Sequence, residues 1–324
     1  KIIFIVERNM KLNVAFQMDP IENINVKEDT TFRLAEKAQI LGHKTFYYTP
    51  ENLFFRNNKI FAKGHFFEVN RNKKIFFNLQ EKKILEISSF FDVVWLRQDP
   101  PFDMSYITTT HLLELISKNC FVINDPFWVR NLPEKIFVLN FPDLIPPTLI
   151  TRDIVEIKNF LNEYDELVIK PLFGNGGNGI FKLSLSDLNL NSILEMFCEK
   201  FKEPFIVQKF LPEVKNGDKR IILLDGEPVG AINRFPKRGE IRSNMHVGGI
   251  AKKTDLNKRD KEICSIIGNI LKQKNQLLVG IDIIGDYLTE INLTSPTGIQ
   301  EVEYFDKIDL GQKVWDIVNK KISK

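Results

Sequence analysis

Three polar side chains near the C-terminal end of the sequence could bind a divalent cation. Two runs rich in Ile, Leu and Val flank Gly285-Asp286 within residues 278–298, which predicts a β-hairpin. Glu290 and Asn292 are two residues apart and share one face of their strand. A two-residue turn would put Asp282 on the opposite face. A three-residue turn, residues 285–287, would instead pair Asp282 with Glu290.

The pairing of these residues would create a metal site. Two carboxylates that face each other repel unless a cation lies between them. Two carboxylates and an amide are hard oxygen ligands, which suit Mg²⁺ that also binds phosphates. The other interpretation is an ordinary half-buried hairpin whose acidic side chains face water. The hairpin alone leaves both interpretations open.

A glycine-rich segment is the second candidate for chemistry. Gly174, Gly176 and Gly179 match G-x-G-x-x-G, but the dinucleotide-binding motif requires a helix after the last glycine. Residues 180–183 are strand-like, which argues against that motif. A strand, a glycine loop and a second strand, with Lys170 just before the loop, are typical of a flap over nucleotide phosphates. The alternative is a hairpin tip, although Lys170 in an apolar strand needs a polar partner.

The bulk composition is that of a globular protein with roughly two domains. The chain has 324 residues, 43% of them hydrophobic, and a net charge of +3, which gives no case for nucleic-acid binding. Its three cysteines are far apart, which fits a reducing, cytoplasmic setting without a zinc site or disulfides. No apolar run approaches the ~20 residues of a membrane span. Met10 is a candidate for the natural start, with residues 1–9 as an upstream extension.

The order of the predicted elements indicates an α/β protein. Strands at 12–18 and 44–48 around a helix at 29–41 predict a parallel α/β unit, joined by a strand at 91–96. Charged residues 97–103 follow that strand, at the edge where open α/β sheets bind ligands. Near residue 131 we expect a short helix, which contains Lys135. Strands and helices that flank the glycine loop should follow it, and then a second hairpin at 219–235. Residues 236–254 show no periodicity and are a candidate lid.

These features together resemble the bacterial glutathione synthetase family of the ATP-grasp superfamily. The resemblance runs from about Met10 to near the C-terminus and rests on MDPIENINVKEDTTF, LRQDPPFD, NDPFWVRNLPEK, NGDKR, DGEPVG and VGIDIIGDYLTEINLTSPTG. It implies an α/β (α+β) fold, with a Rossmann-like parallel-sheet domain at 10–130 followed by a two-subdomain ATP-grasp fold. The ATP-grasp part would comprise a flap subdomain at 131–204 and a C-terminal subdomain at 205–324, which holds the metal hairpin and the lid.

The resemblance also implies roles for individual residues. It places at the ATP site Lys135, Lys170, Gly174, Asn175, Gly176, Gly177, Gly179, Gln208, Lys209, Phe210, Leu211 and Asp218. It implies that Arg220 is catalytic. It also implies that Asp282, Glu290 and Asn292 are ligands of Mg²⁺, with Mn²⁺ as an alternative. It assigns to the dipeptide substrate Arg97, Asp99, Arg234, Ser295 and Thr297. Ile250 stands where the family commonly has an arginine in the lid, and Arg242, Lys252 or Lys253 could take its place.

The activity implied by the resemblance is ATP-dependent synthesis of glutathione. The substrates would be γ-glutamylcysteine and glycine, joined through an acylphosphate with release of ADP and phosphate. The family further implies a cytoplasmic homo-oligomer, a tetramer, with small-molecule substrates and neither nucleic acid nor membrane as partner. Two other functions stay open at this stage: another ATP-grasp carboxylate–amine ligase, such as a peptide or amino-acid ligase, and a non-catalytic ATP-binding regulator.

Overall fold

Residues 10–323 form three β-sheets in the computed structural model, which describes this part of the chain. The predicted extension at residues 1–9 lies outside the described residues. The first sheet contains β1 (Asn13–Met18), β2 (Lys44–Tyr48), β3 (Leu53–Arg56), β4 (Lys59–Val69), β5 (Phe77–Glu86), β6 (Val93–Arg97) and β7 (Phe121–Ile123). The second contains β8 (Thr148–Thr151), β9 (Glu166–Pro171), β10 (Phe181–Ser184) and β11 (Phe205–Lys209). The third contains β12 (Asp218–Leu224), β13 (Glu227–Phe235), β14 (Ile250–Lys253), β15 (Leu278–Ile284) and β16 (Tyr287–Asn292).

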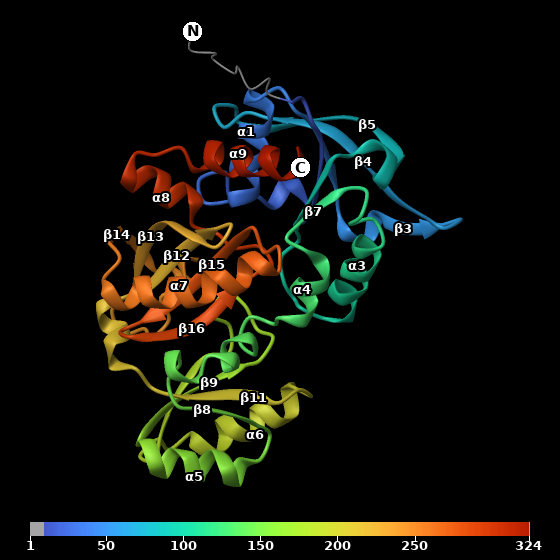
Figure 1. Cartoon of the computed structure of the whole chain (residues 1–324). Coiled ribbons are helices and arrows are strands. Elements are labelled where there is room, and N and C mark those ends of the chain that lie inside the picture. Colours follow the sequence, from blue (N-terminus) through green and yellow to red (C-terminus); the bar gives the residue numbers. More distant parts are fainter. Residues whose placement is uncertain (1–9, 324) are drawn as a thin grey trace.

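The helices lie around these sheets (Figure 1). They are α1 (Thr30–Ile40), α2 (Ile87–Phe90), α3 (Met104–Glu114), α4 (Pro126–Asn131), α5 (Ile154–Tyr164), α6 (Leu190–Lys200), α7 (Lys258–Gln273), α8 (Ile299–Asp306) and α9 (Leu310–Ile322). Among the described residues there is no helix that combines the length and the apolar character needed to span a membrane.

The first sheet confirms the predicted parallel α/β unit. β1 lies between β2 and β6 and is parallel to both, and β7 adds to β6 in parallel. The Asp29 carboxylate accepts a hydrogen bond from Phe32 N at 2.6 Å and so caps the start of α1. β6 ends at Arg97, so the charged residues 97–103 lie at the carboxyl edge of the parallel strands, as predicted.

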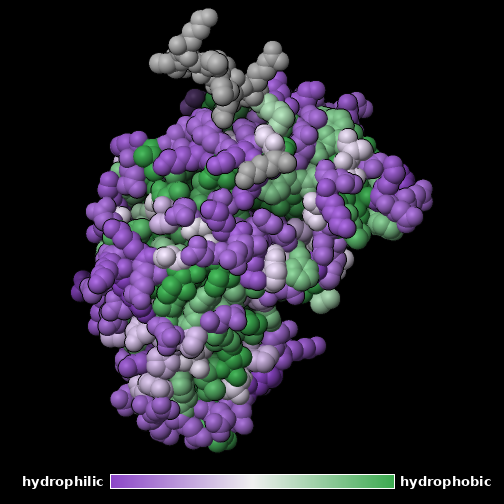
Figure 2. Space-filling view, viewed as in Figure 1, coloured by the Kyte–Doolittle hydropathy of each residue, from purple (hydrophilic) through white to green (hydrophobic). Residues whose placement is uncertain are grey.

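The second sheet and helices α5 and α6 form a small lobe, at the bottom of Figure 1. Leu167 and Ile169 of β9 are buried in the core of this lobe with Leu161 and Phe197 of the two helices. Because side chains alternate along a strand, Lys170 points to the opposite face of the sheet, away from the helices. Figure 2 shows a group of hydrophobic residues on the surface between this lobe and the third sheet.

The third sheet is antiparallel and packs helix α7 against one of its faces. Ile281 and Ile283 of β15 share a core with Ile263 and Ile267 of α7. Asp282 alternates with those two isoleucines and therefore points to the other face. Arg220 of β12 is the cross-strand partner of Asp282, and both side chains lie on that same face.

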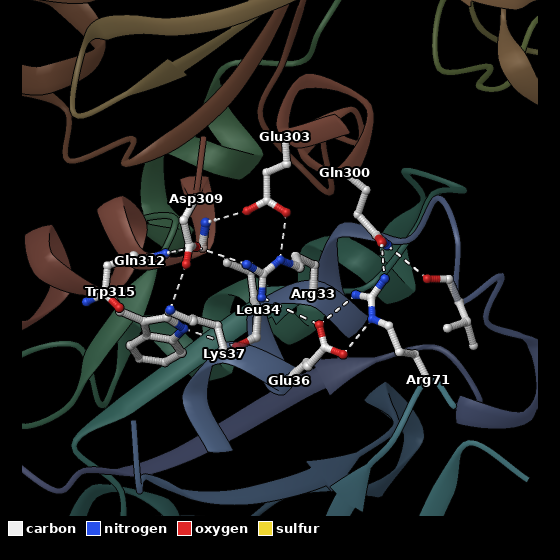
Figure 3. Close-up of polar contacts among 12 residues, drawn as sticks. Arg33, Leu34, Glu36, Lys37, Arg71, Gln300, Glu303, Asp309, Gln312 and Trp315 are labelled. Atoms are coloured by element: carbon white, nitrogen blue, oxygen red, sulfur yellow. Dashed lines mark hydrogen bonds and ion pairs between the residues drawn. The ribbon is translucent and has the colours of Figure 1, made fainter. Parts of the chain in front are cut away.

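An ionic network joins the C-terminal helices to α1 (Figure 3). Arg33 Nε lies 2.7 Å from Glu303 Oε2 of α8, and Arg33 Nη2 lies 2.9 Å from Asp309 Oδ1. Lys37 Nζ lies 2.8 Å from Asp309 Oδ2, and the Trp315 indole donates to Leu34 O at 3.0 Å. Helices α8 and α9 therefore pack beside α1, next to the first sheet. The division of the chain at residues 131 and 205 stays a prediction.

Candidate active site

The hairpin of β15 and β16 pairs Asp282 with Glu290, but by a different turn from the one that was expected. The turn has two residues, because Ile284 pairs with Tyr287. A shift of register after Asp282 then restores its pairing with Glu290. Thr289 is the extra residue at this β-bulge, and its hydroxyl donates to Asp282 O at 3.2 Å. The three-residue turn was therefore wrong, whereas the pairing that it was meant to explain is present.

Asp282 is the most tightly held acid of the site. It is only 2% exposed, and Arg220 binds both of its carboxylate oxygens, with Nη2 2.7 Å from Oδ2. Arg234 Nη2 lies 3.0 Å from Asp282 Oδ1. Burial opposes ionisation, but the two guanidinium groups outweigh it and hold the pKa of Asp282 well below its usual range. The carboxylate is therefore charged, and its charge is balanced by the two arginines.

Asn292 and Asp218 complete the polar surroundings of Asp282. Asn292 pairs with Gly280, and its Nδ2 lies 3.3 Å from Asp282 Oδ2, so the three predicted metal ligands are neighbours on one face. Asp218 accepts from Arg234 Nη2 at 2.6 Å and from the Ser243 hydroxyl at 2.7 Å. Burial raises the pKa of Asp218, while Arg234 and Ser243 oppose that rise. Within residues 10–323, no group of three His, Cys, Asp or Glu side chains could hold a metal ion, so the candidate set depends on the Asn292 amide.

The two predicted phosphate-binding lysines approach this hairpin from different places, Lys135 from a segment packed against the third sheet and Lys170 from β9 of the second sheet. Lys135 Nζ donates to Gly174 O at 2.6 Å and lies 3.5 Å from Glu290 Oε1. Lys170 Nζ donates to Gln208 Oε1 at 3.1 Å, and burial lowers the pKa of Lys170. Lys135 lies in a turn after Pro133, so the short helix predicted around it is wrong. Both ammonium groups still reach the space between the glycine loop and the hairpin.

The glycine loop connects β9 to β10, so a strand follows it, as predicted. Gly176 and Gly177 have φ of +62° and +81°, a region that glycine adopts at little cost. A Cβ on Gly176 would meet no atom within 4 Å, which leaves open space beside that part of the loop. Backbone N–H groups can approach a ligand closely there.

One cavity, here called the flap cavity, lies between the glycine loop and the hairpin. It is partly open to solvent, and its empty space, open solvent included, is about 880 Å³. Eleven of the twelve predicted ATP residues line it, and Gly179 is the exception. The sequence reasoning missed the lining residue Val168, whereas the lining residues Ile241, Ser243 and Asn244 lie in the segment 236–254 that was predicted as a lid. Val168 could have been found, because it lies two residues before Lys170 on the same strand face.

A second cavity, here called the arginine cavity, adjoins the first at the carboxyl edge of the parallel sheet. All five predicted dipeptide residues line it, together with Arg220. The two cavities share the lining residues Asn175, Gly176, Asn244 and Glu290. Sequence reasoning missed Glu134, whose carboxylate accepts from the Thr294 hydroxyl at 2.9 Å and whose pKa is raised by burial.

The comparison with known families matches almost the whole chain. The family model described as "Prokaryotic glutathione synthetase, N-terminal domain" matches residues 12–130, and "Prokaryotic glutathione synthetase, ATP-grasp domain" matches residues 134–307. The glutathione synthetase of Mesorhizobium japonicum is 54% identical over 96% of this chain and 99% of its own length. That of Agrobacterium fabrum is 52% identical over 95% of this chain and 97% of its own.

The chain belongs to the prokaryotic glutathione synthetase family. The resemblance inferred from the sequence motifs is thereby confirmed. Solved structures of lower sequence identity share the ATP-grasp fold with this member of the glutathione synthetase family. The crystal structure of the D-cycloserine synthetase DcsG has a TM-score of 0.68 at 13% identity, covering 96% of this chain and 100% of that one. The ATP-grasp ligase PsnB, in complex with a precursor variant, Mg and ADP, has a TM-score of 0.61 at 14% identity, covering 97% and 99%.

The candidate lid segment, residues 236–254, contains one strand, although its sequence shows no periodicity. Residues 250–253 form β14, in which Ile250 pairs with Phe235 and is 58% exposed. Of the three residues that could replace an arginine at position 250, Arg242 lines the flap cavity, and its Nη1 donates to Gly177 O at 3.4 Å. Lys253 instead pairs with Asp306 at 2.9 Å, and Lys252 lies over the Phe235 ring. Arg242 is therefore the best placed of the three.

Proposed function

We propose that this chain is an ATP-dependent ligase that joins γ-glutamylcysteine to glycine and releases glutathione, ADP and phosphate. The observation that carries the proposal is the meeting of two cavities at Glu290. The flap cavity has the lysines and the glycine loop that suit a triphosphate, and the arginine cavity has the guanidinium groups that suit a carboxylate. The names of the relatives, glutathione synthetases of closely similar length, support the choice of substrates.

Each group of residues has a physical task in this reaction. Lys135 and Lys170 neutralise phosphate charge, and the glycine loop covers the triphosphate with its N–H groups. Arg220 holds the cysteinyl carboxylate against the γ-phosphate, so that a carboxylate oxygen attacks phosphorus and ADP leaves. The glycine amine then attacks the acyl carbon of the acylphosphate, and phosphate leaves with that oxygen. Residues 241–244 line the flap cavity, and Asn244 and Met245 line the arginine cavity, so this segment would exclude water, which hydrolyses acylphosphates.

The oxygen donors near Glu290 fit a divalent cation. Asp282, Glu290 and Asn292 offer two carboxylates and an amide on one face, and arginines balance the Asp282 charge here. We propose them as ligands of Mg²⁺ or Mn²⁺, which when bound would offset the charge of the phosphate oxygens. The tetrameric state and the cytoplasmic location stay predictions of the family resemblance.

Phosphate release from ATP tests the proposed function. We expect full release only with γ-glutamylcysteine and glycine both present, and a low rate when glycine alone is omitted. Omission of γ-glutamylcysteine should abolish release, because no carboxylate is then available for phosphorylation. Equal release without the dipeptide, or efficient use of another amino acid in place of glycine, would contradict the assignment.

A further inference from the structure

The small lobe of the second sheet, at the bottom of Figure 1, contacts the rest of the protein chiefly through its glycine loop. In the described part of the chain, no strand or helix of this lobe packs extensively on an element of the other two sheets. Two polar contacts reach the loop, from Lys135 Nζ to Gly174 O and from Arg242 Nη1 to Gly177 O. Lobes that share so little packed surface can move relative to each other, so a few contacts decide where the glycine loop lies.

An aromatic contact is the third link to the glycine loop. Phe173, directly before the loop, stacks on Phe102, which lies in the segment after β6 of the first sheet. Their ring centroids are 5.9 Å apart and their planes meet at 22°, a favourable geometry for two aromatic rings. Phe102 also contacts Tyr106 of α3, a fully buried residue in the core of the first sheet, at 5.2 Å between centroids. The aromatic contact therefore joins that core to the base of the glycine loop.

A small pocket, here called the bridging pocket, adjoins both the flap cavity and the arginine cavity. Phe102 and Phe173 both line it. It has lining residues in common with each cavity, Lys135 and Gly174 with the flap cavity and Pro100, Glu134 and Thr294 with the arginine cavity. Pro100 is only two residues before Phe102. A shift of the segment after β6 at the arginine cavity is therefore passed to the glycine loop through the aromatic contact.

We propose that Phe102 and Phe173 are positioning residues that couple ligand binding in the two cavities. A ligand in the arginine cavity fixes the segment after β6, the aromatic contact holds Phe173 against that segment, and the glycine loop stays over the flap cavity. Such coupling is reciprocal, so each ligand strengthens the binding of the other by the same factor. The inference rests on the proposed function, and it adds that γ-glutamylcysteine strengthens nucleotide binding through the protein.

This coupling makes the position of the glycine loop depend on the dipeptide. ATP that is bound alone is less completely covered, because the loop is then held by fewer contacts. The loop closes fully when the carboxylate that accepts the phosphoryl group is present. Binding of one substrate thus completes the site for its reaction with the other, which protects ATP and the acylphosphate from water.

Titration calorimetry of the full chain with ADP and Mg²⁺ tests the coupling. The Kd of ADP is measured without γ-glutamylcysteine and with a saturating concentration of it, in the absence of glycine and phosphate. ADP supports no turnover under these conditions, and it lacks the γ-phosphate that would contact the dipeptide carboxylate directly. We expect the dipeptide to lower the Kd of ADP about tenfold in the unaltered chain, a typical size for coupling between two sites.

Substitutions of the two rings identify the route of the coupling. Phe173→Ala and Phe102→Ala should each reduce the effect of the dipeptide to less than about twofold, and the double variant should match either single variant, because both remove the same contact. Both side chains are partly exposed, so neither variant empties a fully buried position. The matched control is Phe160→Ala, which removes a partly buried ring of α5 that contacts Tyr164 and lines none of the three cavities. It should keep the tenfold effect.

Three results would overturn the coupling. The first is an unaltered chain that binds both ligands independently, and the second is an undiminished effect of the dipeptide in Phe173→Ala or Phe102→Ala. The third is an equal loss in Phe160→Ala, which would indicate general destabilisation of the lobe. Failure of the proposed function is a distinct result, because γ-glutamylcysteine titrated alone into the unaltered chain would then give no binding heat.

Discussion

Replacing Glu290 with glutamine is expected to lower kcat about 1,000-fold, the size of effect found when a group that stabilises transition-state charge is removed. Glu290 lies opposite Asp282, with its Oε1 3.5 Å from Lys135 Nζ, and it lines both cavities. Glutamine keeps the shape but removes the charge that would hold a divalent cation beside the phosphates. The measurement is kcat at saturating ATP, both organic substrates and Mg²⁺.

The same variant has a second readout that does not depend on turnover. Titration calorimetry of ADP binding should show a clear dependence on Mg²⁺ in the unaltered chain and a much weaker one in Glu290→Gln. Glu213→Gln is the matched control, because Glu213 is exposed beside the hairpin turn and lines neither cavity. Near-normal turnover of Glu290→Gln would contradict the metal assignment.

Replacing Arg234 with glutamine is expected to lower the free energy of unfolding by about 3–5 kcal/mol, as for other broken buried ion pairs. Arg234 is 3% exposed and contacts both Asp218 and Asp282. Asp282 would keep Arg220, but Asp218 would keep only the Ser243 hydroxyl. Urea unfolding at neutral pH measures the loss.

The destabilisation by Arg234→Gln should depend on pH in a defined direction. Burial raises the pKa of Asp218 in the folded chain, so the folded state binds this proton more tightly than the unfolded state does. Without Arg234 this effect grows, so stability should rise as the pH falls through the raised pKa of Asp218 toward the pKa that this aspartate has in the unfolded chain. The double variant Arg234→Gln/Asp218→Asn should regain part of the loss at neutral pH. A loss that is equal at every pH, with no recovery in the double variant, would exclude Asp218 as the unpaired group.

The local part of the site could be predicted because it follows from strand periodicity. Glu290 and Asn292 are two residues apart, and Lys170 alternates with buried Ile169, so the faces follow from the sequence alone. The turn length could not be predicted in the same way. The bulge at Thr289 depends on how β15 and β16 pack within the sheet, and both turn lengths are compatible with Gly285-Asp286.

Contacts between residues that are far apart in the sequence could not be predicted from the sequence. Arg33 contacts Glu303 across 270 residues, and nothing in either helix alone specifies that contact. The turn at Lys135 was predicted as a helix because Pro133 suits a first helical turn, yet only a 3₁₀ segment follows, at Phe137–Asn140. Asp19 and Glu134 lie in segments that carry the family resemblance, but their place beside the site depends on tertiary packing that the sequence does not specify.

The central claim is that a substrate carboxylate is phosphorylated between the two cavities. Oxygen-18 in both oxygens of the cysteinyl carboxylate tests this claim, with the released phosphate analysed by mass spectrometry. Formation and breakdown of an acylphosphate predict one labelled oxygen in each phosphate, with the other label retained in the new amide. Unlabelled phosphate formed alongside the peptide product would contradict the account.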